Sequence, residues 1–125
     1  MRILLVGEYS RLHNSLKEGL LALGNEVLLI SSGDYFKDYP SDIKLTRRFE
    51  KGFLKKLKVG IYKLFGADIG SISLKRQFFK HSEQLKGYDV VQFINQNPIG
   101  IQAKQEIEII NFLKTHNRKL FLLAC

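Results

Sequence analysis

The sequence has little of what disulfide-bonded, secreted or membrane-spanning proteins need. Cys125 is the only cysteine, which excludes an internal disulfide and a cysteine metal cluster. The apolar runs are much shorter than the roughly 18 residues of a spanning helix. The run at the amino terminus ends at Gly7, too early for the apolar region of a signal peptide. These absences favour a cytoplasmic location.

Glycine is scarce where nucleotide cofactors need it. Gly7–Leu12 follows the first apolar run, where dinucleotide-binding domains carry the pattern G-x-G-x-x-G, but it contains a single glycine and is not a P-loop. Glu8 alone does not supply the acidic pair of a receiver domain. His13, His81 and His116 have neither metal-ligand spacing nor partners for nucleophilic catalysis. We therefore expect no metal and no bound cofactor.

Acidic residues are scarce in one region of the chain. Between Lys44 and Lys80 there are eleven basic and two acidic residues, whereas the rest of the chain has nine basic and ten acidic residues. The formal net charge of +8 is thus a local basic patch on a nearly neutral domain. Such a patch indicates an anionic partner.

The basic patch has three interpretations. The segment Arg47–Phe65 has the apolar spacing of an amphipathic helix, whose phenylalanine and leucine stripe would pack on the sheet. The same helix would suit the surface of an anionic membrane, at the inner face of the cytoplasmic membrane. Nucleic acid is disfavoured because no nucleic-acid module is recognisable. The candidate membrane-surface residues are Arg47, Arg48, Lys51, Lys55, Lys56, Lys58 and Lys63.

An alternation of strand and helix patterns fills the chain. Short apolar runs between turn residues predict buried strands, and apolar residues at helical spacing lie between them. This order predicts a Rossmann-like, doubly wound α/β domain with a parallel sheet of strand order 3-2-1-4-5. The predicted strands are Met1–Val6, Glu26–Ile30, Asp42–Thr46, Tyr88–Ile94 and Lys119–Ala124. Because the strand pattern runs to Cys125, we expect the chain to be part of a longer protein.

The helix boundaries follow from capping residues. Ser10 is expected to cap the first helix and Gly24 to end it, and Asn97 with Pro98 should begin the last helix. A further helix is predicted over Ile72–Leu85. The first helix should turn four leucines to the sheet, and the last helix should turn Ile99, Ala103, Ile107 and Ile110 inward.

Polar side chains follow the first and fourth predicted strands. Ligands of open parallel sheets bind outside the carboxyl ends of the strands, near the point where the strand order reverses. That point lies between the turns at Gly7–Arg11 and Asn95–Pro98. Hydroxyl, amide and charged groups there suit a neutral, hydroxyl-rich sugar, although the same residues could only cap helices or face solvent. The candidate acceptor-binding residues are Glu8, Tyr9, Ser10, Arg11, Asn95, Gln96 and Asn97.

Three motifs together resemble the amino-terminal domain of GT-B-fold glycosyltransferases, in the family-4-like group with many bacterial polysaccharide enzymes. Met1–Arg11 looks like the opening strand and acceptor-side loop of that family. Leu20–Val27 resembles its Leu-Gly-His-Glu-Val join, with Asn25 in place of histidine. Tyr88–Asn95 resembles its Asp-Val-Val-His strand, with Gln92 in place of histidine.

The resemblance implies the acceptor-side half of a two-domain enzyme. Residues 1–125 would form this domain, with a basic insertion at about 47–80, and a carboxyl-terminal domain would hold most of the nucleotide-sugar site. Such enzymes transfer a sugar from the nucleotide-sugar donor to a glycan or glycolipid acceptor. The family's catalytic histidine often follows the strand matching Leu120–Ala124, and Cys125 stands there, so the catalytic residue is unknown. The alternative is a non-enzymatic, flavodoxin-like regulatory or binding module.

Overall fold

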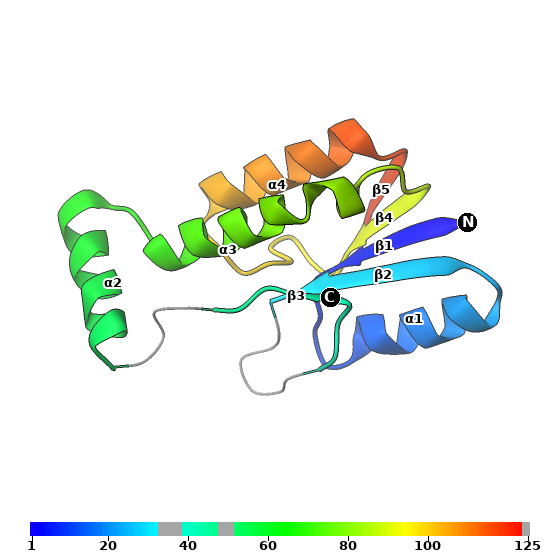
Figure 1. The fold of residues 1–125 in the computed structure, drawn as a ribbon, viewed down its shortest axis with the longest axis horizontal. Coiled ribbons are helices and arrows are strands. Elements are labelled where there is room, and N and C mark those ends of the chain that lie inside the picture. Colours follow the sequence, from blue (N-terminus) through cyan, green and yellow to red (C-terminus); the bar gives the residue numbers. More distant parts are fainter. Residues whose placement is uncertain (33–38, 48–51, 124–125) are drawn as a thin grey trace.

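The computed structural model describes residues 1–32, 39–47 and 52–123, and it confirms the predicted Rossmann-like α/β fold (Figure 1). All strand pairs are parallel, and the strand order is β3-β2-β1-β4-β5. The strands are β1 Arg2–Val6, β2 Glu26–Ser31, β3 Ile43–Lys44, β4 Val90–Phe93 and β5 Lys119–Leu122. The α-helices are α1 Leu12–Ala22, α2 Gly52–Phe65, α3 Ile69–Lys80 and α4 Ala103–His116.

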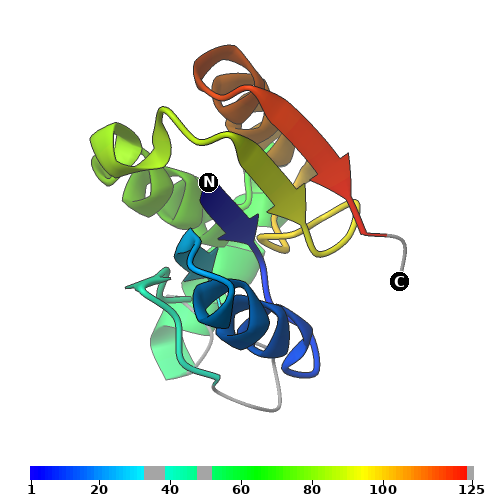
Figure 2. The same ribbon diagram turned by 90° about the vertical axis from the view of Figure 1, so that its right-hand side faces the viewer.

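Helices cover both faces of the sheet, as Figures 1 and 2 show. On one face, α3 and α4 bury the larger core, which includes Leu4, Phe78 and Ile109. On the other face, α1 lies over β1 and β2. Figure 2 shows no other helix beside α1 on that side of β4 and β5, and Phe121 of β5 is correspondingly exposed. Both faces of the sheet are thus covered beside β1, where the strand order reverses.

The predicted leucine stripe of α1 is confirmed only for Leu20, which packs against the core of Ile3, Leu5, Val27 and Leu29. Leu12, Leu16 and Leu23 are exposed, whereas His13 is fully buried. The His13 ring donates from Nδ1 to the carbonyl oxygen of Gly7 at 2.7 Å. This bond fixes the side of α1 that faces the sheet, and periodicity of apolar residues does not reveal it. The predicted end of the helix is confirmed, because Gly24 has a φ of +86° and donates to the carbonyl oxygen of Leu21.

The beginning of α4 also differs from the prediction. Asn97 and Pro98 lie in a loop, and the helix begins at Ala103 with Gln102 as its N-cap. Of the four residues predicted to face inward, Ile99 is buried in the loop and Ile110 packs against the core, whereas Ala103 and Ile107 are exposed. The residues of α4 that are buried are Gln105, Glu106, Ile109 and Leu113.

The middle helices differ from each other in how they pack. The predicted helix over Ile72–Leu85 is found as α3 followed by a 3₁₀ turn at Ser82–Leu85. Its apolar spacing turns Leu74, Phe78 and Leu85 inward, and all three are buried. The predicted packing of the α2 stripe on the sheet is wrong, because no residue of α2 is buried. Figure 1 shows α2 standing apart from the sheet beyond the amino-terminal end of α3.

Candidate functional site

The turns after β1 and β4 meet at the carboxyl edge of the sheet, as the strand order requires. A Cβ atom placed on Gly7 would lie 2.5 Å from Cγ2 of Ile94 and 2.6 Å from the carbonyl oxygen of Pro98. Gly7 also has a φ of +89°, which favours glycine. The two predicted halves of the site are therefore in direct contact, and there is no space for a ligand between Gly7 and Pro98.

The Glu8 side chain caps the amino terminus of α1, a role that the sequence prediction gave to Ser10, while Arg11 occupies the N-cap position. Its carboxylate is buried and accepts from the backbone N–H groups of Tyr9 at 2.8 Å, His13 at 3.0 Å and Asn14 at 2.7 Å. Ser10 cannot cap in the usual way because its φ of +50° is left-handed rather than extended. The acceptors of Glu8 are thus occupied by the protein, and Glu8 holds the turn in place.

The next three residues form the exposed rim of this edge. Tyr9, Ser10 and Arg11 all face solvent. The guanidinium of Arg11 forms an ion pair with Glu18 and donates to the hydroxyl of Ser15. Ser10 and Arg11 have φ values of +50° and +66°, which is uncommon for residues other than glycine. Such backbone strain is concentrated at functional sites, and here it turns these side chains outward from the domain.

The three polar residues after β4 shape their own loop. The side-chain oxygen of Asn95 accepts from the N–H of Asn97 at 2.8 Å, and that of Asn97 accepts from the N–H of Ile101 at 3.3 Å. Gln96 and Asn97 are exposed, and Asn95 is half-buried. The side-chain amide groups remain at the surface, where they can donate to a ligand.

A hollow of about 320 Å³ lies between α1 and the segment before β3. Glu18, the partner of Arg11, is one of its walls, so the hollow adjoins the rim. Lys17 forms an ion pair with Asp42 at 2.7 Å, so its charged walls are paired. The residues lining the hollow are Asn14, Lys17, Glu18, Leu21, Pro40, Ser41 and Asp42.

A network on the other side of the β4 turn has no counterpart in the sequence predictions. The Arg47 guanidinium donates to the carbonyl oxygens of Ile99 at 3.0 Å and Gly100 at 3.3 Å, and to the hydroxyl of Ser32 at 3.1 Å. Arg47 was a candidate for a membrane surface, but it holds this loop against the carboxyl end of β2. Nothing in its sequence position distinguishes it from its basic neighbours.

Glu106 is the second missed residue. It is buried in the first turn of α4. Its carboxylate accepts from the N–H groups of Ile99 at 3.3 Å and Ile101 at 3.4 Å. Burial raises the pKa of Glu106 to about 7, although these bonds and the nearby charge of Arg47 act in the opposite direction. Glu106 therefore ties the loop after β4 to α4 and changes its charge near neutral pH.

His13 and Gln92 connect the two sides of the site beneath the surface. Because Nδ1 of His13 donates to the Gly7 carbonyl, its Nε2 is the acceptor of the Gln92 side-chain amide at 3.3 Å. Burial lowers the pKa of His13, which outweighs the opposite effects of the Gly7 hydrogen bond and the Glu8 charge. His13 is therefore a neutral side chain whose two ring nitrogens both have partners within the protein. Its role is to position the turn after β1.

Four of the other candidate membrane-surface residues lie on α2. Lys55, Lys56 and Lys63 are exposed, and Lys58 is half-buried with its ammonium 3.8 Å from the carboxylate of Asp68. Arg48 and Lys51 lie outside the described residues. Within residues 1–32, 39–47 and 52–123, the helices are too short or too polar to cross a bilayer. No three His, Cys, Asp or Glu side chains in these ranges are grouped to hold a metal ion.

Comparisons of the chain with protein-family models, with curated proteins and with solved structures find no match. The chemistry of the site is therefore the basis of the functional assignment.

Proposed function

We propose that the chain is the acceptor-side domain of a glycosyltransferase that transfers a sugar from a nucleotide-sugar donor to a glycan or glycolipid acceptor. The observation that carries the proposal is the hollow of about 320 Å³ along α1, which adjoins the rim through Glu18, the partner of Arg11. A hollow of this size is in the range of small-molecule sites. The donor would bind to a second Rossmann-like domain, as the family resemblance implies.

The paired charges around the hollow support a neutral ligand. Arg11 is paired with Glu18 and Lys17 with Asp42. These pairs leave hydrogen-bond donors and acceptors at the surface but little net charge, and a phosphate group needs a net positive site. A sugar acceptor has many hydroxyl groups that can both donate and accept, so it suits such walls better than a nucleotide does.

The amino terminus of α1 supports the same conclusion. A helix amino terminus is where Rossmann-like domains bind a pyrophosphate through free backbone N–H groups. Here the Glu8 carboxylate accepts from the N–H groups of His13 and Asn14. A phosphate would meet a carboxylate there and no free donors. The domain is thus suited to the acceptor, and the nucleotide-sugar must be held elsewhere in the enzyme.

The side chains of the rim supply the test. In the enzyme with its donor-binding domain, we expect Arg11→Ala and Asn95→Ala to raise the acceptor KM by about 3- to 10-fold each, the effect of one lost hydrogen bond. The KM for the nucleotide-sugar should not change. Initial rates at varied acceptor concentration measure both constants. Lys104→Ala, on an exposed position of α4, is the control.

The stability of the variants separates binding from folding. Arg11 is exposed, so Arg11→Ala should change the free energy of unfolding by less than about 0.5 kcal/mol. Asn95→Ala removes the side-chain oxygen that accepts from the Asn97 N–H. This loss should lower the free energy of unfolding by about 1 kcal/mol. Unchanged acceptor kinetics in both variants would refute the site. A protein that binds saccharides but transfers no sugar would be the non-enzymatic binding module instead.

A further inference from the structure

Helix α2 exposes an unusual amount of apolar surface. Phe53 is 76% exposed, and Leu64 and Phe65 are each 79% exposed. The helix is attached to the domain beside α3, through the ion pair of Lys58 with Asp68, the N-cap residue of α3. Residues of α2 are otherwise exposed or half-buried. The helix therefore presents most of its surface to the surroundings.

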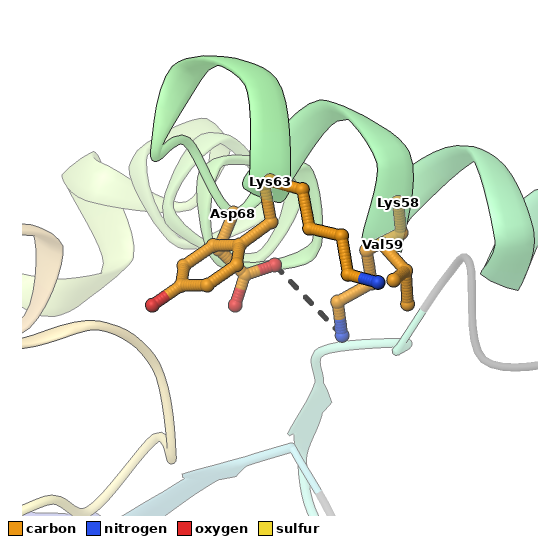
Figure 3. Close-up of a pocket in the computed structure, with 5 residues that line it drawn as sticks. Lys58, Val59, Lys63 and Asp68 are labelled. Carbon is orange, nitrogen blue, oxygen red and sulfur yellow. Dashed lines mark ion pairs between the residues drawn. The ribbon is translucent and has the colours of Figure 1, made fainter.

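One side of α2 lines a hollow beside Asp68, the N-cap residue of α3. Lys58, Val59, Tyr62 and Lys63 line a hollow of about 370 Å³ together with Asp68. Figure 3 shows the labelled side chains of Lys58, Val59 and Lys63 directed to this side of the helix, with Lys58 paired to Asp68. An amphipathic helix of a domain in water normally turns its apolar side inward. In α2, by contrast, Phe53, Leu64 and Phe65 are largely exposed, and Ile61 is only half-buried.

The apolar side chains of α2 form one continuous face. At 3.6 residues per turn, six of them fall within an arc of about 120° on the side away from the hollow. Lysines border this arc at both edges, with Lys58 at one edge and Lys56 at the other. The six residues of this apolar face are Phe53, Leu54, Leu57, Ile61, Leu64 and Phe65.

The charge of α2 indicates what kind of partner suits the apolar face. The helix has four lysines and no acidic residue. In the described part of the chain, no acidic side chain forms an ion pair with Lys55, Lys56 or Lys63. A face that is apolar in the middle and cationic at its edges matches an anionic bilayer surface, where acyl chains take up the apolar residues and headgroups meet the lysines.

We propose that α2 is a membrane-binding helix that lies in the interface of a bilayer containing anionic lipids, with its apolar face toward the acyl chains. Each lysine near such a surface contributes about 1 kcal/mol to the free energy of membrane binding. Burial of the phenylalanine and leucine side chains in the acyl region strengthens the binding further. The proposal rests on α2 alone and does not depend on the acceptor site.

Tryptophan fluorescence provides a direct test because the chain has no tryptophan. In the Phe53→Trp variant of the whole chain, vesicles of phosphatidylglycerol and phosphatidylcholine should shift the emission to shorter wavelength, and brominated acyl chains should quench it. Vesicles of phosphatidylcholine alone should have a much smaller effect. In the Leu23→Trp variant, which places the reporter at the exposed C-cap position just after α1, the emission should not change.

Co-sedimentation tests the contribution of the lysines. Changing Lys55, Lys56 and Lys63 to glutamate should weaken binding to the anionic vesicles by more than about 100-fold. The matched control changes Lys104, Lys114 and Lys119, which are exposed on α4 and β5, and should retain most of the binding. Binding of the unchanged protein should decrease as salt is added.

Two results would overturn the proposal. One is failure of the unchanged protein to sediment with anionic vesicles at low salt. The other is equal loss of binding in the two lysine variants, which would show that only total charge matters. Circular dichroism establishes that each variant is folded. Self-association of the chain through Phe53 and Leu64, measured by light scattering without lipid, would instead assign the apolar face to a second copy and also overturn it.

Discussion

Replacing Gly7 with alanine should lower the free energy of unfolding by about 3 kcal/mol or more. The added methyl group would meet Ile94 and the carbonyl oxygen of Pro98 at 2.5 Å and 2.6 Å. It would also occupy a backbone with φ of +89°, which disfavours a side chain. Relief of the contacts would separate the two turns that form the site. Urea unfolding followed by circular dichroism measures the change.

Gly24 provides a matched control for Gly7. It has a similar φ of +86°, but a Cβ atom placed there meets no atom within 4 Å. Gly24→Ala should therefore lower the free energy of unfolding by only about 1 kcal/mol, because only the left-handed backbone disfavours the alanine. The difference between the two variants isolates the close approach of the turns. Equal losses in both variants would show that Gly7 and the Pro98 loop do not touch in solution.

Glu106 should make the stability of the domain depend on pH. Its pKa is about 7 in the folded protein and near 4.5 when unfolded, so between these values the folded state holds the proton more tightly. The stability that Glu106 gains for the folded state by holding its proton more tightly is therefore fully present below pH 4.5, and it is lost as the pH rises to about 7. The full difference between the two pKa values corresponds to at most about 3 kcal/mol in the free energy of unfolding.

The Glu106→Gln variant isolates this effect from other titrating groups such as His13. Glutamine resembles the protonated acid, so parent and variant should differ by less than about 1 kcal/mol near pH 4.5. At pH above 7, where the parent carboxylate is charged, the variant should be the more stable by about 2 kcal/mol. Urea unfolding of both proteins across this range measures the difference. A difference independent of pH would show that Glu106 ionises alike in both states.

The strand order was predictable because the alternation of strands and helices is typical of doubly wound parallel sheets, and the burial pattern marks the central strands. Runs such as Leu4–Val6 and Leu29–Ile30 are apolar on both faces of the sheet, which is typical of central parallel strands. Glycine at position 24 ended the first helix for a local reason, a left-handed backbone. Features that depend on a few neighbouring residues are therefore well specified by the sequence.

The features that were wrong depend on residues far apart in the chain or on specific polar bonds. The buried side of α1 is set by a hydrogen bond from His13 to Gly7, and its cap is Glu8 rather than Ser10. The start of α4 was placed too early because Asn97 and Pro98 also suit a loop. No periodicity could reveal that the apolar side of α2 faces away from the sheet.

The sequence predicted where the candidate site lies but not which side chains are in contact there. Strand order alone brought Tyr9 and Asn95 to one edge of the sheet. The hollow along α1 is lined by Asn14 and Ser41 among others, and the sequence gives no sign that these residues are close. The Arg47 and Glu106 bonds to the loop after β4 were also missed, because both residues look like ordinary surface charges in the sequence.

The most direct test of the proposed function is a nuclear magnetic resonance titration of the chain with neutral disaccharides of hexoses and N-acetylhexosamines. The proposal predicts shifts in the backbone amides of Tyr9 and Arg11 at the rim and of Glu18 and Ser41 in the hollow with at least one disaccharide, and no shift there with uridine diphosphate. A site that responds to the nucleotide and to none of the disaccharides would contradict the assignment of this domain to the sugar acceptor.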